Sequence, residues 1–167
     1  MHILHKAALY LTSISLVACT ASPTGRKQVL LFSDQEMSSL GAQSFEEMKK
    51  NIAIEKDEKI NAYVQCVANA ITDSVPKNGF SQWEVVVFKS DDINAFALPG
   101  GKIGVYTGLL NVAKNQDQLA TVIGHEVAHV LAEHGNERMS QAQLTNAGLQ
   151  LTNIAIGASE YSQYQQI

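Results

Sequence analysis

Residues 121–131 limit the possible folds of this chain most, because they carry the pattern His-Glu-x-x-His at His125, Glu126 and His129. On an α-helix, two residues four positions apart lie about 40° apart in projection, since 3.6 residues make one turn. Both imidazoles can then reach one metal ion, and Glu126, beside the first histidine, can reach a water on that metal. Two nitrogen ligands and a carboxylate that takes a proton from a metal-bound water are typical of zinc peptidases.

The neighbours of the motif favour a packed helix over a chance match. Val127 and Ala128, between the histidines, are uncharged, and apolar residues continue the helical face at 122–123 and 130–131. One buried histidine is common in protein cores, but packing alone does not explain two histidines one turn apart with a glutamate between them. The sequence therefore predicts one zinc ion per chain, held by the two histidines, with the glutamate as general base.

Length and composition indicate one globular domain. The chain has 167 residues, of which 46% are hydrophobic and 17% charged, so it can bury a core. Its net charge of −4 and its lack of a basic stripe argue against nucleic acid as a partner.

Residues 1–18 have the character of a secretory signal, in which a weakly basic start precedes an apolar run too short to span a bilayer. The run ends in Leu16-Val17-Ala18-Cys19, which resembles the lipobox of bacterial lipoproteins, where the cysteine becomes the diacylated N-terminus. The alternative is an ordinary signal cut near Ala18 or Ala21. By analogy with lipoprotein sorting, Thr20 implies anchoring at the periplasmic face of the outer membrane.

A lipid on Cys19 would leave Cys66 without a partner, so no intrachain disulfide is expected. Cys66 falls in an apolar helical segment and is predicted to be a small buried hydrophobic residue. Residues 19–32 are predicted to be a lipidated tether. Arg26 and Lys27 in this tether lie either near lipid headgroups or in a solvated turn.

Two helices are expected in the first half of the domain. Ser33 and Glu36 have the spacing of a capping box, which predicts a helix to about Asn51. A second helix is expected from near Asp57, stopped by Pro76 and Gly79. The residues predicted to face inward are Met37, Leu40, Gly41, Phe45 and Met48 in the first helix and Ile60, Val64, Val67, Ala68 and Ile71 in the second.

Three strands are predicted next, at residues 83–89, 93–98 and 103–107. The turn at 99–102 joins the last two into a hairpin. Asp91 and Asp92, between the first two strands, are predicted to form a solvated turn.

Two more helices complete the expected elements. One runs from an N-cap at Asn115 to about His134, with Gly135 as its C-cap. The other covers about 137–156 and packs into the core, because polar residues interrupt it too often for a membrane helix. Its predicted core residues are Met139, Ala142, Leu144, Ala147, Leu151 and Ile154.

Several motifs together resemble the zinc peptidases related to the CAAX prenyl proteases, metallopeptidase family forty-eight. They are Thr24-Gly25-Arg26, the run 94–101, Gly108-Leu109-Leu110, and the metal motif with its continuation through 134–140. The lipobox resembles that of the bacterial lipoprotein branch of this family. The resemblance implies an α+β, gluzincin-like peptidase domain, in which helices pack on a small antiparallel sheet with the His-Glu-x-x-His helix beneath it.

The resemblance also implies a third zinc ligand, a glutamate in an acidic motif on a later helix. No such motif precedes Ile167, so residues 33–167 are expected to be the N-terminal part of a longer peptidase domain. His134 is not expected to replace the missing ligand, because a continuous helix would place it about 140° from His129. Glu133 would point along the helix, and Glu160 is a lone carboxylate of the kind usually found on surfaces.

The resulting hypothesis is a zinc-dependent endopeptidase acting on periplasmic or membrane-associated proteins, in envelope protein quality control. Asn94, Ala95 and Phe96 either pair with the backbone of a peptide substrate or form a plain sheet strand. The alternative function is a lipid-anchored, non-catalytic binding protein or chaperone. The intact glutamate of the metal motif favours the enzyme, and the sequence does not indicate an oligomeric state.

Overall fold

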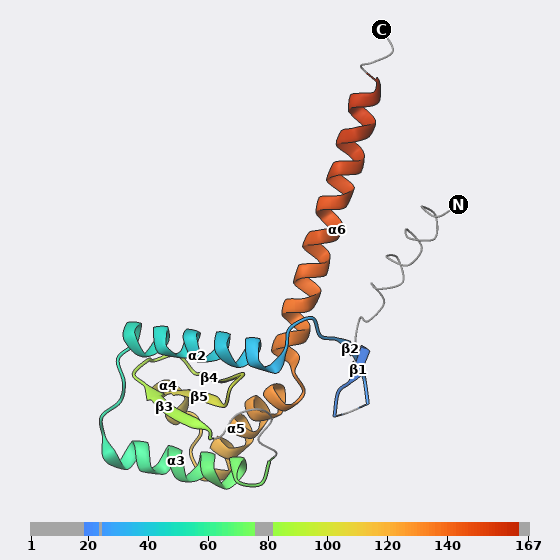
Figure 1. The fold of residues 1–167 in the computed structure, drawn as a ribbon. Coiled ribbons are helices and arrows are strands. Elements are labelled where there is room, and N and C mark those ends of the chain that lie inside the picture. Colours follow the sequence, from blue (N-terminus) through green and yellow to red (C-terminus); the bar gives the residue numbers. More distant parts are fainter. Residues whose placement is uncertain (1–18, 24, 76–81, 164–167) are drawn as a thin grey trace.

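The computed structural model describes residues 19–23, 25–75 and 82–163, with side chains for 21–23, 25–75 and 82–150. The expected signal at 1–18, Pro76 and Gly79 lie outside the described residues. Figure 1 shows the elements along the chain. They are β1 (Cys19–Ala21), β2 (Lys27–Val29), α2 (Asp34–Asn51), α3 (Glu58–Thr72), β3 (Glu84–Phe88), β4 (Ala95–Leu98), β5 (Lys102–Tyr106), α4 (Thr107–Leu110), α5 (Gln116–Leu131) and α6 (His134–Gln163).

The main sheet has the strand order β3-β5-β4, and the three predicted strands are confirmed to within two residues at each end. The hairpin is also confirmed, and its turn uses Gly100 and Gly101 at φ +80° and +73°, which glycine adopts readily. The α+β class is confirmed, but the prediction of a purely antiparallel sheet is wrong. Strand β4 pairs with one side of β5 in antiparallel orientation. Strand β3 pairs with the other side of β5, in parallel orientation.

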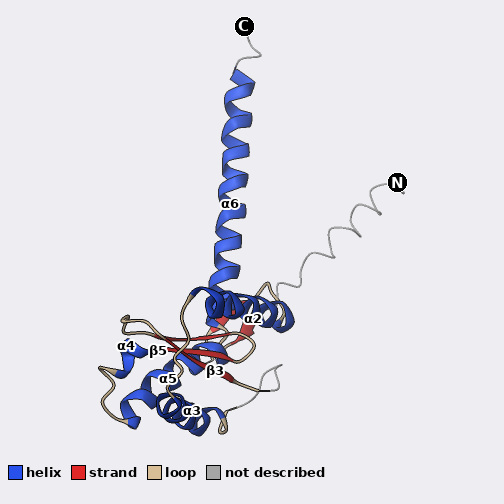
Figure 2. Cartoon of the chain, turned by 90° about the vertical axis from the view of Figure 1, so that its left-hand side faces the viewer, coloured by secondary structure: helices blue, strands red, loops and turns tan. Residues whose placement is uncertain are grey.

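Helix α2 covers one face of this sheet, and α3 and α5 cover the other (Figure 1), an arrangement that Figure 2 shows from the side. Alternation along each strand explains the two layers, because successive side chains point to opposite faces. On the α2 face, the Phe45 ring packs edge-on against Phe88 and Phe96, with centroids 5.9 and 6.2 Å apart. On the other face, Ile103 and Val105 are fully buried in one core cluster with residues of α3 and α5.

The predicted helix starts are confirmed by their caps. Ser33 Oγ accepts a hydrogen bond from Glu36 N at 3.3 Å, and Glu36 Oε2 accepts one from Ser33 N at 2.7 Å, which completes the capping box. The Ser33 hydroxyl also donates to Glu36 Oε2 at 2.7 Å, and this bond, together with the one from Ser33 N, lowers the pKa of the Glu36 carboxyl. The side chains of Asp57 and Asn115 cap α3 and α5 by accepting hydrogen bonds from backbone N–H groups of the first turn.

In α2 and α3, two residues predicted to be buried are exposed, Leu40 (41% exposed) and Cys66. The buried stripe of α2 runs through Met37, Gly41 and Phe45, at a spacing of four, and Leu40 is turned about 100° away from Gly41. In α3, Cys66 lies on the side opposite Val64 and Ala68 for the same reason. The prediction of a buried Cys66 is therefore wrong.

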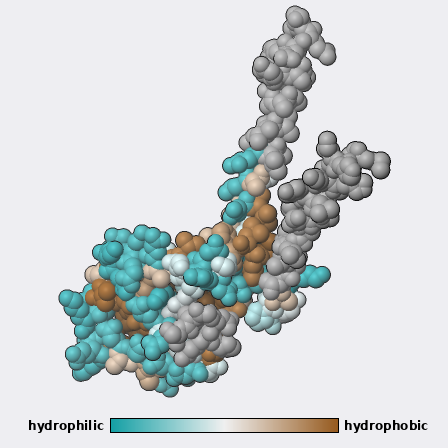
Figure 3. Space-filling view, in the orientation of Figure 1, coloured by the Kyte–Doolittle hydropathy of each residue, from teal (hydrophilic) through white to brown (hydrophobic). Residues whose placement is uncertain are grey.

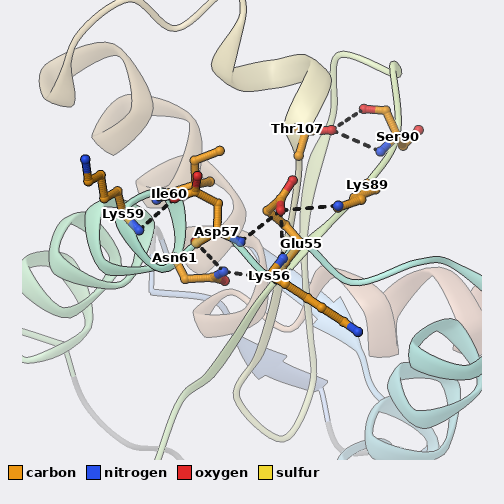
Figure 4. A network of polar contacts seen from close by, with 9 residues as sticks. All are labelled: Glu55, Lys56, Asp57, Lys59, Ile60, Asn61, Lys89, Ser90 and Thr107. Carbon is orange, nitrogen blue, oxygen red and sulfur yellow. Dashed lines mark hydrogen bonds and ion pairs between the residues drawn. The ribbon is translucent and has the colours of Figure 1, made fainter.

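A network of polar contacts joins the segment between α2 and α3 to the end of β3 (Figure 4). Glu55 accepts hydrogen bonds from the backbone N–H groups of Lys56 and Asp57, at 2.7 and 2.9 Å, and pairs with Lys89 at 3.4 Å. These contacts lower the pKa of the Glu55 carboxyl. Beside them, Thr107 Oγ1 donates to Ser90 O at 2.9 Å. The turn at Asp91 and Asp92 that follows is exposed, as predicted.

The last helix differs most from expectation. It begins at His134 and extends to Gln163, and it projects away from the body of the domain (Figure 1). The predicted core packing is wrong for Met139, Ala142, Leu144 and Ala147, which are exposed. The side chains of Leu151 and Ile154 lie outside the described residues. Figure 3 shows apolar surface along the lower part of this helix. None of the described helices is long and apolar enough to cross a membrane.

The N-terminal segment forms a short hairpin, β1 with β2, and then binds the first turns of α6. Leu31 N donates to Ser140 Oγ at 2.8 Å, and Asn136 Nδ2 donates to Phe32 O at 2.7 Å. The two terminal guanidinium nitrogens of Arg26 donate hydrogen bonds to the two carboxylate oxygens of Glu137, at 2.6 and 2.5 Å. This pairing lowers the pKa of the Glu137 carboxyl. The sequence indicated no protein partner for Arg26.

Candidate metal centre

Helix α5 carries the His-Glu-x-x-His pattern, and its buried face fixes the helix in place. Leu119, Ile123 and Val127 recur every four residues, and each is at most 1% exposed against the core. The two histidines lie off this stripe: His125 is exposed and His129 is half-buried. The pattern thus places apolar contacts on one side of the helix and imidazoles on another.

The two imidazoles point toward one another. His125 Nε2 and His129 Nε2 are 3.0 Å apart, and the ring centroids are 4.5 Å apart. Two nitrogens bound at 2.0–2.1 Å to a tetrahedral zinc ion lie about 3.3–3.4 Å from each other. The observed separation of the two Nε2 atoms is a few tenths of an ångström shorter than this distance. Glu126, between them in sequence, is half-buried.

A third histidine lies at this site, which the sequence did not predict. His134 Nδ1 is 2.5 Å from His129 Nδ1. The predicted angle of about 140° assumed one continuous helix, but α5 ends at Leu131 and α6 begins at His134. Glu133, at φ 54°, makes the break, and Gly135 lies within α6 instead of capping α5. The prediction that Gly135 caps the C-terminus of α5 is therefore wrong.

The other acidic candidates do not complete a set of metal ligands. Within the residues that the structure describes, no three His, Cys, Asp or Glu side chains are grouped so that they could hold a metal ion. Glu133 instead lines a pocket, and its burial, together with the charge of Asp34, raises the pKa of its carboxyl. The side chain of Glu160 lies outside the described residues.

A pocket of about 310 Å³ adjoins His129. Met37 of α2, Leu98 and Pro99 at the end of β4, and Val130 of α5 give it apolar walls, and acidic side chains lie among them. It connects the metal motif to the strand that was considered for substrate binding.

Strand β4 is hydrogen-bonded to β5 alone in the sheet as described, so its other side is an edge. Ala95 is buried, Phe96 packs toward α2, and Asn94 lies just before the strand. Strand addition requires such an edge, while a plain edge strand would look the same.

Comparison with known proteins points to one family. The sequence profile of "Peptidase family M48" matches residues 55–166. Metalloendopeptidase OMA1 of Bos taurus is 35% identical over 127 residues, which are 72% of this chain and 24% of that protein. Metalloprotease LoiP of Escherichia coli is 34% identical over 122 residues, 72% of this chain and 46% of LoiP.

A more distant relative is the beta-barrel assembly-enhancing protease of Yersinia pestis, 26% identical over 110 residues, 66% of this chain and 22% of that protein. The chain thus spans less than half the length of each of these three relatives.

Proposed function

The chain belongs to peptidase family M48, and from this premise we propose that it acts as a zinc-dependent endopeptidase. The family resemblance drawn from the sequence motifs is thereby confirmed. The observation that carries the proposal is the pair of Nε2 atoms 3.0 Å apart on a helix held by a buried apolar stripe. In this proposal His125 and His129 bind one zinc ion per chain, and Glu126 is the general base.

A zinc ion at this position would polarise the scissile carbonyl and lower the pKa of its bound water. Glu126, one residue from the first proposed ligand, would act as the general base that takes a proton from the attacking water and passes it to the leaving amine. Catalytic zinc sites use three protein ligands plus water. We propose that the third ligand is the later glutamate that the family resemblance implies, and not one of the side chains described at this site.

The substrates we propose are flexible segments of periplasmic or membrane-associated proteins. An extended peptide would add to the edge of β4 beside Asn94, Ala95 and Phe96 through main-chain hydrogen bonds, which give little sequence preference. One of its side chains would enter the pocket beside His129. This placement supports a role in envelope protein quality control, because unfolded chains expose such segments.

The proposed domain organisation follows from the same assignment. Residues 1–18 would be the lipoprotein signal, 19–32 a lipidated segment anchored through Cys19 to the outer membrane on its periplasmic face, and 33–167 part of the peptidase domain. The lipobox-like run at 16–19 supports the anchor.

The test is Glu126→Gln in the full chain. The variant should bind zinc as wild type does and lose roughly 10²–10⁴-fold of its casein cleavage, because an amide cannot accept the proton of the water. Chelator-sensitive cleavage by wild type is the reference, and Glu47→Gln, an exposed position on α2, is the control for the change in charge. Cleavage by Glu126→Gln within a few-fold of wild type would remove this residue from the mechanism.

A further inference from the structure

We infer that His134 is a positioning residue for the metal ligand His129. In this inference, His134 Nδ1 accepts the hydrogen of His129 Nδ1, and His129 Nε2 is left free to face the metal. The inference rests on the proposed function, because it takes His129 as a ligand. It gives a role to a histidine that the catalytic mechanism does not use.

The distance between the rings carries the argument. His129 Nδ1 and His134 Nδ1 are 2.5 Å apart, and two nitrogen lone pairs would repel at this distance, so the contact is favourable with one proton between the atoms. A neutral imidazole carries one N–H, so if His134 were the donor, the proton of His129 would lie on its Nε2. That atom could then not bind a metal. Donation from His129 to His134 is the one arrangement of two neutral rings that leaves Nε2 available.

The contact with His125 agrees with this assignment. With its proton on Nδ1, His129 has a lone pair on Nε2, which accepts a hydrogen bond from His125 Nε2–H across 3.0 Å. In the assigned network, His125 donates to His129 and His129 donates to His134. Metal binding then requires only that the His125 proton leave Nε2, while the bond between His129 and His134 stays in place. Partners that fix the tautomer in this way are usual for histidines that bind metals.

The fold holds His134 in this position from two sides. The break at Glu133 turns the chain so that the first residue of α6 meets the last turn of α5. Beyond it, Asn136 and Ser140 are buried and hydrogen-bonded to residues 31–32, and Glu137 is held by Arg26. The start of α6 is therefore fixed by polar contacts. The continuation of the metal motif through 134–140 gains a structural reason.

A packing role for the His134 ring is the competing explanation, since its centroid lies 4.8 Å from that of His129. Two substitutions separate the explanations. His134→Gln keeps a hydrogen-bond acceptor and loses the ring, whereas His134→Phe keeps a ring and loses the acceptor. A positioning role is preserved better by glutamine, and a packing role by phenylalanine.

The first experiment measures zinc affinity of the full chain by competition with a chromophoric chelator. His134→Phe should weaken binding by roughly 10–100-fold, the usual effect of losing such a partner, and His134→Gln should stay within a few-fold of wild type. His129→Ala is the control that removes the ligand itself, and thermal unfolding of each variant checks that it folds. Equal affinity of His134→Phe and wild type would overturn the inference, as would a stronger loss in His134→Gln than in His134→Phe.

The second experiment uses the metal-free wild-type chain and does not depend on any variant. Long-range ¹H–¹⁵N correlation spectra identify which ring nitrogen of His129 carries the proton. A proton on Nδ1 is expected, and a proton on Nε2 would contradict the inference. If wild type bound no zinc, the proposed function would fail, while this spectrum would still decide between donor and acceptor at His129.

Discussion

Two glutamates near the start of α6 have opposite electrostatic surroundings. Glu133 lines the pocket near Asp34, and burial and the charge of Asp34 raise the pKa of its carboxyl. Glu137 lies one turn later and is held by Arg26, which lowers the pKa of its carboxyl. The first carboxylate is therefore less favourable in the folded state than in the unfolded chain, and the second is more favourable.

The two residues should change stability with pH in opposite directions. Glu133 costs stability as pH rises above its unfolded pKa, so Glu133→Gln should gain stability relative to wild type between pH 4 and pH 7. Glu137 contributes stability above its unfolded pKa and loses it in acid, so Glu137→Gln should lose stability relative to wild type over the same range. Urea unfolding of both variants at pH 4, 5.5 and 7 measures this. A parallel pH trend in the two variants would show that these surroundings are assigned wrongly.

At the scale of elements, the features that depend on neighbouring residues were predicted correctly, and those that depend on distant contacts were not. The starts of α2, α3 and α5 were predictable because Ser33, Asp57 and Asn115 each cap a helix through contacts within three residues. The pairing of β3 with β5 depends on which side of β5 is free after the hairpin forms, which no local pattern records. The break between α5 and α6 was not predicted for another reason. The residue with left-handed backbone is Glu133, whereas the usual residue at the end of a helix in this conformation is glycine.

The candidate site divides in the same way. The pair His125 and His129 follows from helical periodicity, so its convergence was predictable. The approach of His134 to His129 follows from the break, and the break is supported by contacts between α6 and a segment more than a hundred residues earlier. Such contacts leave no spacing that a single sequence reveals.

The contact between α2 and the hairpin turn makes a prediction about two glycines. A Cβ on Gly41 would lie 2.1 Å from the backbone oxygen of Pro99, whereas a Cβ on Gly124, in α5, would meet nothing within 4 Å. Gly41→Ala should therefore destabilise the fold by about 1–3 kcal/mol, because backbone must shift to relieve the overlap. Gly124→Ala should stabilise it by up to about 1 kcal/mol through helix propensity. Chemical denaturation compares the two, and a gain in stability for Gly41→Ala would refute the close packing of α2 on this turn.

For the whole molecule, a few described contacts link the segment that begins at Cys19 to the metal helix. Strand β1 begins at Cys19 and pairs with β2, so that Cys19 lies opposite Val29. Two residues after Val29, Leu31 N donates a hydrogen bond to Ser140 Oγ of α6. Helix α6 begins at His134, whose ring contacts His129. In the proposed lipoprotein, a lipid on Cys19 would therefore be linked to the site through the described strands β1 and β2 and the first turns of α6.

The proposed lipid anchor would make membrane attachment depend on one cysteine. Cys19→Ser in the full-length protein should move it from the membrane pellet to the soluble periplasmic fraction, because the substitution removes the proposed site of diacylation. Cys66→Ser is the matched control, since Cys66 is a free, exposed thiol on α3 and should leave the distribution unchanged. Fractionation with a high-salt wash, followed by immunoblotting, separates lipid anchoring from adsorption by charge. If Cys19→Ser still pellets after the wash, the protein is held by something other than a lipid on this residue, and the assignment of 16–19 as a lipobox is wrong.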